Sequence, residues 1–272
     1  MSFRSAGTTT IFAIALSVTG HAAQSAEIAV MSVLPLKPFL TEVGPQFEKE
    51  TGHKLSIKFD VSAALKRQID AGEAFDVAVL LPALIDDLLK QGKVAPGTRI
   101  DVSRAGVAVA VKKDAAKPDI ASAEALKKTL LNAKSIAYSS EGGSGTYFKG
   151  LLERLGITAE TADKLKPLTS SAVVPSVAKG EAELAVISPP AILADPGVEM
   201  VGLMPKELQQ YVVYTAGISA AAKEPEASKA LLKYLTTPAA LVVMKAKGLE
   251  PSTVTLLRWL RRVRANVCTG RS

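Results

Sequence analysis

The chain lacks most of the residues that build metal centres and nucleophilic active sites. Of its 272 residues one is cysteine, Cys268, and two are histidines, of which only His53 lies beyond the first 25 residues. A single cysteine excludes a disulfide framework within the chain and a cysteine-built metal site. With a single histidine, neither a Ser-His-Asp set nor a zinc site of the usual ligands is predicted. We therefore expect no metal and no cofactor.

Apolar runs long enough to cross a membrane are also missing. Residues 11–18 (IFAIALSV) fall far short of the roughly 20 residues that a spanning helix needs. They follow Arg4 and precede small residues around Ser25, which is the pattern of a secretory signal peptide cleaved before Ala26. The alternative is a buried N-terminal helix. We expect residues 1–25 to be removed and the mature chain to reside in the periplasm.

Basic charge is in surplus, but it is not spread over the chain. The formal net charge is +7, yet of the 33 Lys and Arg residues Arg4 lies in the leader and five lie among the last twenty-one residues, which hold no acid. The body between them has 27 basic and 26 acidic residues. A nucleic-acid-binding domain spreads its basic charge over one face, so no nucleic-acid partner is expected.

The last segment, residues 252–272, differs in composition from the rest of the chain. It holds the only Trp and the only Cys, and four apolar residues fall on one helical stripe among its arginines. Such a pattern is typical of a basic amphipathic helix at a membrane surface. We favour the alternative, a tail that is poorly ordered or not native.

The body alternates strand patterns with helical patterns. Strands are predicted at 27–33, 54–59, 75–80, 105–111, 135–139, 183–187 and 211–216, and helices at 36–51, 62–72, 82–92, 125–132, 146–155, 227–235 and 237–248. The β-α-β-α order predicts α/β structure with a parallel sheet covered by helices on both faces. We expect two lobes, one of residues 26–106 with 210–251 and one of residues 107–209.

Residues 139–152 (SSEGGSGTYFKGLL) join a predicted strand to a predicted helix through a glycine run. A P-loop needs Gly-Lys-Ser/Thr, but Lys149 follows Phe148. The dinucleotide fingerprint fails as well, because Phe148 stands where its third glycine belongs. A free linker is not expected between a strand and an amphipathic helix. What remains is a strand–turn–helix.

A strand–turn–helix of this composition is suited to binding an anion. Gly142, Gly143 and Gly145 allow backbone N–H groups to approach a ligand, Ser144 and Thr146 add hydroxyls, and the helix N-terminus adds partial positive charge. The alternative is a tight turn in which the glycines supply positive φ angles and nothing is bound.

Two other segments repeat this arrangement. Residues 60–64 (DVSAA) join a strand to a helix through Ser62, and Ser32 stands near the end of the first strand. Open α/β sheets bind ligands where strand ends face helix N-termini. The alternative for each serine is a plain N-cap. Three such segments favour convergence on a cleft between the lobes.

Several segments in order resemble one family. They are residues 45–52 (PQFEKETG), 61–80 (VSAALKRQIDAGEAFDVAVL), 143–157 (GSGTYFKGLLERLGI), 179–187 (KGEAELAVI) and 233–240 (KYLTTPAA). This pattern is similar to the periplasmic molybdate-binding proteins, which are type 2 solute-binding proteins of ABC importers, over about residues 27–250. The resemblance implies a monomeric two-lobe type 2 periplasmic binding protein fold that binds a small oxyanion in the interlobe cleft and docks on an inner-membrane ABC permease.

In that family serine hydroxyls, backbone N–H groups and one tyrosine hold the oxyanion. The matching positions here include Ser62 and Ser144, but Pro35 replaces the first serine, and Ser188 replaces the tyrosine. The ligand-binding set that we predict is Ser32, Ser62, Ala63, Ser144, Gly145, Thr146, Tyr147, Ser170 and Ser188.

Exported aconitate isomerases, a smaller group of the same superfamily, resemble the chain at residues 30–32 (VMS). Moving the double bond between cis- and trans-aconitate needs a base beside a carboxylate-bearing carbon and an anion hole. Asp60 and Glu141 lie in the predicted binding loops, although such acids are more often solvated charges or caps, and Lys37 and Arg67 stand nearby. We favour a transport receptor for a molybdate-like oxyanion and keep an aconitate isomerase-type enzyme as the alternative.

Overall fold

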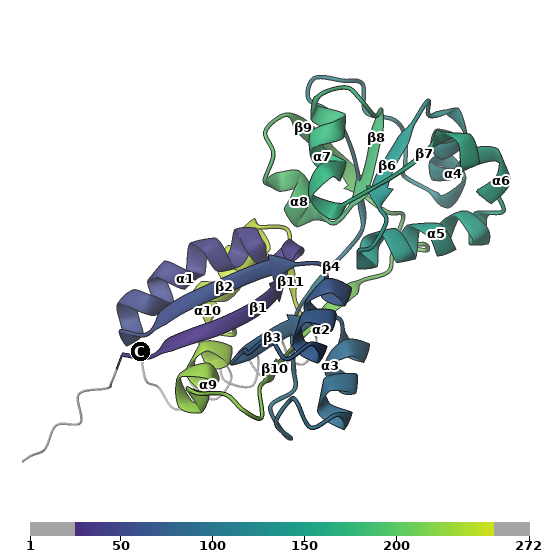
Figure 1. The fold of residues 1–272 in the computed structure, drawn as a ribbon. Coiled ribbons are helices and arrows are strands. Elements are labelled where there is room, and N and C mark those ends of the chain that lie inside the picture. Colours follow the sequence, from purple (N-terminus) through teal and green to yellow (C-terminus); the bar gives the residue numbers. More distant parts are fainter. Residues whose placement is uncertain (1–24, 253–272) are drawn as a thin grey trace, which may run out of the picture.

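The structure, a computed structural model, describes residues 25–252 as two α/β lobes (Figure 1). Residues 1–24 of the predicted signal peptide and residues 253–272 of the predicted tail lie outside the described residues. Within residues 25–252 no helix is both long and apolar enough to cross a bilayer.

The first lobe is built on a six-stranded sheet. Its strand order is β11-β4-β10-β3-β1-β2. The strands are β1 (Glu27–Val33), β2 (Lys54–Asp60), β3 (Val77–Leu80), β4 (Ile100–Ala105), β10 (Val212–Ile218) and β11 (Glu250–Pro251). The predicted parallel pairing is right for β1, β2 and β3, but β10 runs antiparallel to β3 and β4. β10 differs because the chain returns from the second lobe and enters this sheet from the opposite end.

The second lobe has a five-stranded sheet of order β7-β6-β8-β5-β9. Its strands are β5 (Ala108–Lys112), β6 (Ile136–Ser139), β7 (Leu165–Leu168), β8 (Leu184–Ile187) and β9 (Val198–Leu203). β6 is parallel to β7 and β8, whereas β5 is antiparallel to β8 and β9. The carboxyl ends of β6, β7 and β8 therefore open on one edge, where the helices that follow these strands begin.

The predicted continuous strand at 105–111 is wrong, because two strands of different sheets share this apolar run. β4 ends at Ala105 and pairs with β10, and β5 begins at Ala108 and pairs with β8. Residues 106–107 cross between the lobes, and residues 204–211 return. The two connections touch: a Cβ on Gly106 would lie 3.0 Å from Nε2 of Gln209.

Helices cover both faces of the first sheet. The helix α1 (Lys37–Thr51) buries Phe39, Leu40, Val43 and Phe47, as the helical spacing predicts, and ends at Gly52 with φ of 77°. α1 packs on α10 (Pro238–Ala246), and the ring of Phe47 contacts Tyr234 of α9 (Pro225–Tyr234). The opposite face carries α2 (Ser62–Asp70) and α3 (Pro82–Lys90).

Helices also cover both faces of the second sheet, with a separate apolar cluster under each. α4 (Ala123–Asn132), α5 (Gly143–Leu155) and α6 (Thr158–Thr161) cover one face. α7 (Ser170–Ala178) and α8 (Pro189–Leu193) cover the other. The sequence did not predict α7 and α8, because α7 contains adjacent valines and Pro175, and α8 is five residues long with two prolines at its start.

The first turn of α5 presses against the end of β6. A Cβ on Gly145 would lie 1.6 Å from the carbonyl oxygen of Ser139, and one on Gly142 would lie 2.7 Å from Ser139 Oγ. None of Gly142, Gly143 and Gly145 has a positive φ angle. The alternative in which these glycines supply positive φ is therefore wrong, and at Gly142 and Gly145 glycine is required for close approach.

Gly145→Ala should destabilise the protein by about 3 kcal/mol or more, because its Cβ meets a backbone atom that cannot turn aside. Gly150→Ala in the same helix is the matched control, because nothing lies within 4 Å of its Cβ position. The free energy of unfolding of the control should rise by about 0.5–1 kcal/mol, because alanine has a higher helix propensity than glycine. Urea unfolding of both variants measures the difference, and equal stabilities would contradict the packing described.

Candidate functional site: a cleft between the lobes

A cavity of about 570 Å³ lies between the two lobes. The first lobe contributes the loop after β1 with the short 3₁₀ helix η1 (Leu34–Leu36), and the starts of α1, α2 and α3. The second lobe contributes the starts of α5 and α7, and α8. The cavity thus lies at the edge where both sheets direct their strand ends.

The helices that begin at the cavity have free N-termini. The N-caps of α2, α5 and α7 are Val61, Gly142 and Thr169, and none forms a side-chain capping bond or is followed by an acid in the first turn. The predicted N-caps Ser122 and Thr237 do form side-chain capping bonds, at the starts of α4 and α10, and these helices begin away from the cavity. First-turn N–H groups and partial positive charge therefore remain available in the cleft.

Five of the nine predicted site residues line this cavity, and four do not. Those in the lining are Ser62, Ala63, Ser144, Ser170 and Ser188. Ser32 is fully buried in β1, and its hydroxyl has no partner among the described residues. Gly145 lies against Ser139, and neither residue is in the cavity lining.

The remaining two, Thr146 and Tyr147, line a neighbouring cavity of about 640 Å³ on the other side of the start of α5. The Tyr147 hydroxyl donates a hydrogen bond to the carbonyl oxygen of Leu208 at 2.6 Å. The phenol is therefore held by the segment that returns to the first lobe.

Ser62 is not the N-cap that the alternative reading of the sequence required. It occupies the first helical position of α2, and its Oγ accepts a hydrogen bond from the N–H of Leu81 at 3.1 Å. A serine hydroxyl has one proton and can accept twice. Since Leu81 supplies the proton of this bond, the Ser62 proton is left to donate elsewhere, and Ser62 lines the cavity.

Tyr214 is a cavity residue that the sequence did not predict. It stands on β10 in the first lobe, and its side chain is 4% exposed. Its hydroxyl has no hydrogen-bond partner among the described residues, and burial raises the pKa of the phenol far above its usual value. It is therefore a neutral donor. The sequence predicted only that it lies on a strand, at residues 211–216.

Charged residues in the lining are few and of both signs. Lys37, Glu141 and Asp195 line the cavity, and Asp195 already accepts a hydrogen bond from the N–H of Gly197. Of the two acids that the sequence proposed as bases, Glu141 is in the lining, whereas Asp60 is outside it and accepts from the N–H of Val61. Among residues 25–252 no cluster of three or more His, Cys, Asp and Glu side chains could hold a metal ion.

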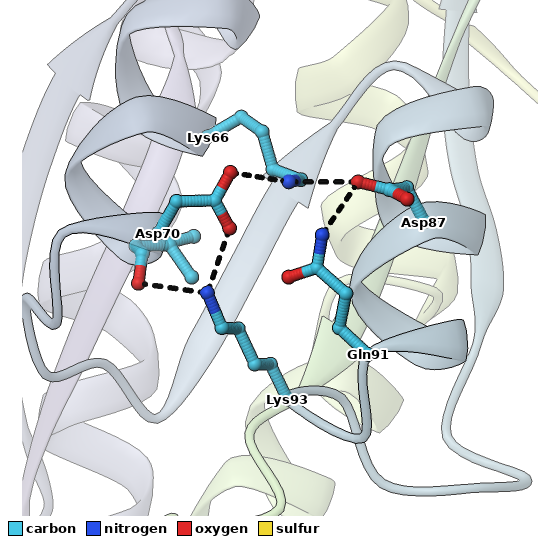
Figure 2. A network of polar contacts seen from close by, with 6 residues as sticks. Lys66, Asp70, Asp87, Gln91 and Lys93 are labelled. Atoms are coloured by element: carbon cyan, nitrogen blue, oxygen red, sulfur yellow. Dashed lines mark hydrogen bonds and ion pairs between the residues drawn. The ribbon is translucent and has the colours of Figure 1, made fainter.

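An ion network ties α2 to α3 (Figure 2). Lys66 of α2 lies 2.5 Å from Asp70 and 2.7 Å from Asp87 of α3, and Lys93 lies 2.7 Å from Asp70. Burial works to lower the pKa of Lys66, but its hydrogen bonds to the two aspartates outweigh burial and raise it. Hydrogen bonds from Lys66 and Lys93 lower the pKa of Asp70. The network therefore ties the C-terminal halves of α2 and α3 together, and the hydrogen bond between Leu81 and Ser62 joins their starts.

Comparison with known proteins agrees with this architecture. The profile of the family described as bacterial extracellular solute-binding protein matches residues 28–250. The chain belongs to this family.

Among its relatives, this solute-binding protein is 33% identical over 230 residues to an aconitate isomerase from a Pseudomonas species, which covers 82% of this chain and 87% of that protein. It is 28% identical over 243 residues to the molybdate-binding protein ModA of Azotobacter vinelandii, which covers 88% of this chain and 95% of that protein. The solved periplasmic molybdate-binding protein of Azotobacter vinelandii superposes with a TM-score of 0.69 at 21% identity, over 83% of this chain and 98% of that one. The predicted two-lobe type 2 periplasmic binding protein fold is confirmed.

The pKa of Tyr214 gives a testable pH dependence. Because the folded-state pKa is raised above the unfolded value of 10.0, the associated stability is present below pH 10 and is lost as the pH rises above it. Tyr214→Phe has no phenol to ionise and should not lose this stability. Above pH 10 the free energy of unfolding of the variant, measured with urea, should therefore rise relative to that of the wild type. Tyrosinate absorbance should be equal in both native proteins at pH 10, and an extra ionised phenol in the wild type would contradict the burial.

Proposed function

We propose that this solute-binding protein is an exported receptor that binds a small oxyanion of the molybdate type in the cleft and presents it to an inner-membrane ABC permease. The observation that carries the proposal is the meeting of three uncapped helix N-termini with serine hydroxyls at one cavity. Backbone N–H groups and hydroxyls bind anions without a positive side chain. The ModA relatives are named as molybdate-binding proteins, which supports this ligand class.

The donors come from both lobes, which suits a receptor that closes on its ligand. Ser62 and Tyr214 belong to the first sheet and its helices, and Ser144, Ser170 and Ser188 belong to the second. We assign residues 26–106 and 210–251 to one moving body and residues 107–209 to the other. Hinge closure at the paired connections would bring both donor sets onto one anion.

The location of the protein follows from the same proposal. A receptor that delivers an anion to an inner-membrane permease works in the periplasm, and residues 1–25 have the pattern of the signal peptide that export requires. The family description, extracellular solute-binding protein, supports export. We propose that the mature protein is a monomer.

An aconitate isomerase-type enzyme is a second candidate, because a relative with that name is 33% identical. Glu141 and Lys37 both line the cavity, and a volume of about 570 Å³ lies within the range of pockets for ligands larger than a tetrahedral ion. In this reading Glu141 accepts a proton from the methylene carbon of aconitate, and cleft donors stabilise the delocalised anion. The proton then returns to the far carbon of the three-carbon unit, which moves the double bond.

A thermal-shift panel on the mature protein should separate these functions. The panel contains molybdate, tungstate, sulfate, phosphate, citrate and both aconitates. A ligand at 100 times its dissociation constant adds about 2.7 kcal/mol of stability, so binding is visible as a raised melting temperature. We expect shifts with molybdate and tungstate. Shifts with the aconitates alone would replace the oxyanion receptor by the second candidate, and no shift with any of these anions would contradict an anion cleft.

Turnover of cis-aconitate, followed with the same protein, tests the enzyme directly. If the second candidate holds, Glu141→Gln should lower the rate by about 100-fold or more while the aconitate shift remains. Asp60→Asn is the matched control, because Asp60 is outside the cavity lining and should leave the rate unchanged. Absence of turnover in the wild type would exclude the isomerase.

A further inference from the structure

A buried hydroxyl lies directly behind the cleft wall. Ser139, the last residue of β6, is fully buried and is not part of the cavity lining. Its Oγ lies 2.6 Å from Oγ of Ser170, which does line the cavity, and accepts a hydrogen bond from the N–H of Gly142 at 2.8 Å. Three polar groups from β6, the start of α5 and the start of α7 therefore form a chain that ends in the cleft.

The direction of this chain follows from counting protons. Each serine hydroxyl has one proton, and the Gly142 amide can only donate, so Ser139 already accepts one bond. If Ser170 donated to Ser139, the Ser139 proton would have no acceptor among the described residues at a fully buried site, which is strongly unfavourable. If Ser139 donates to Ser170, every buried group is satisfied. The Ser170 proton is then left facing the cavity.

We propose that Ser139 is a positioning residue that fixes the hydroxyl of Ser170 as a hydrogen-bond donor toward the cleft. The inference deepens the proposed function and rests on it for the presence of an anion that accepts this bond. The Ser62 hydroxyl in the opposite lobe is oriented in a similar way. It accepts a hydrogen bond from the N–H of Leu81, which leaves its own proton to donate into the cavity. Each lobe then contributes a serine whose proton is directed at the ligand before the ligand arrives.

The missing side chain of Gly142 also leaves room for the two serine hydroxyls. A Cβ on Gly142 would lie 2.7 Å from Ser139 Oγ and 3.1 Å from Ser170 Oγ, and would occupy the space that the two hydroxyls share. Gly142 therefore serves as a donor whose missing side chain leaves room for the chain of hydroxyls. Ser170 is in the predicted ligand-binding set, but its contact with Ser139 spans thirty-one positions of the sequence, so no local motif predicts the pair.

The direction of the chain can be measured without any ligand. In protein carrying ¹³C-labelled serine in mixed H₂O and D₂O, a slowly exchanging hydroxyl splits its Cβ signal by the deuterium isotope shift, and a rapidly exchanging one does not. We expect a split signal for Ser139 and an averaged signal for Ser170. A split Ser170 signal, with Ser139 either split or averaged, would reverse the direction and overturn the proposal, and so would averaging of both.

Calorimetric titration with molybdate, and with trans-aconitate, tests the effect on binding. Ser139→Ala and Ser170→Ala should each weaken binding by about two- to tenfold, the range of one hydrogen bond. The double variant should bind no more weakly than Ser170→Ala alone, because Ser139 acts through Ser170. A merely structural role would make the two losses multiply, which would contradict positioning.

Ser140→Ala is the matched control in the same loop. Its hydroxyl donates to the carbonyl oxygen of Leu168 at 3.1 Å and is outside the cavity lining, so binding should not change. If the wild type binds neither anion, the proposed function fails, while the ligand-free measurement on Ser139 still decides the direction of the hydroxyl chain.

Discussion

The site depends on the close approach of α5 to the end of β6. The backbone at Gly145 passes so near the Ser139 carbonyl that no side chain fits between them. This contact directs the start of α5 at the cleft, with Ser144 in the cavity lining. It also brings the N–H of Gly142 onto the Ser139 hydroxyl and that hydroxyl onto Ser170. One packing constraint therefore sets both the backbone donors and the hydroxyl donors of the second lobe.

The first lobe also holds its hydrogen-bond donors in fixed positions, but through different contacts. There the ion network of Lys66, Asp70 and Asp87 holds α2 beside α3, and the N–H of Leu81 orients the Ser62 hydroxyl. Because the lining carries one basic and two acidic side chains, net charge would not attract the proposed anion. In the proposed function fixed dipoles attract it, and they need no reorganisation when the ligand enters.

Local sequence signals predicted local structure well and missed what depends on long-range contacts. The caps Ser122 and Thr237 and the first three strands follow from neighbouring residues and are present. The run at 105–111 looked like one strand because composition does not reveal that Ala105 pairs in the first sheet and residues 108–111 pair in the second. Tyr214 was not among the predicted site residues, because its place in the cavity depends on the return of β10 beside β3.

The central claim is that first-turn backbone N–H groups hold the anion, and the affinities of Ser144→Pro and Ser144→Ala test it most directly. Both variants lack the hydroxyl, but only proline also lacks the N–H, and proline is tolerated in a first helical turn, as Pro38 is in α1. For the anion that most stabilises the wild type, Ser144→Pro should bind about tenfold more weakly than Ser144→Ala, a difference of about 1.4 kcal/mol. Equal affinities in two folded variants would contradict the account.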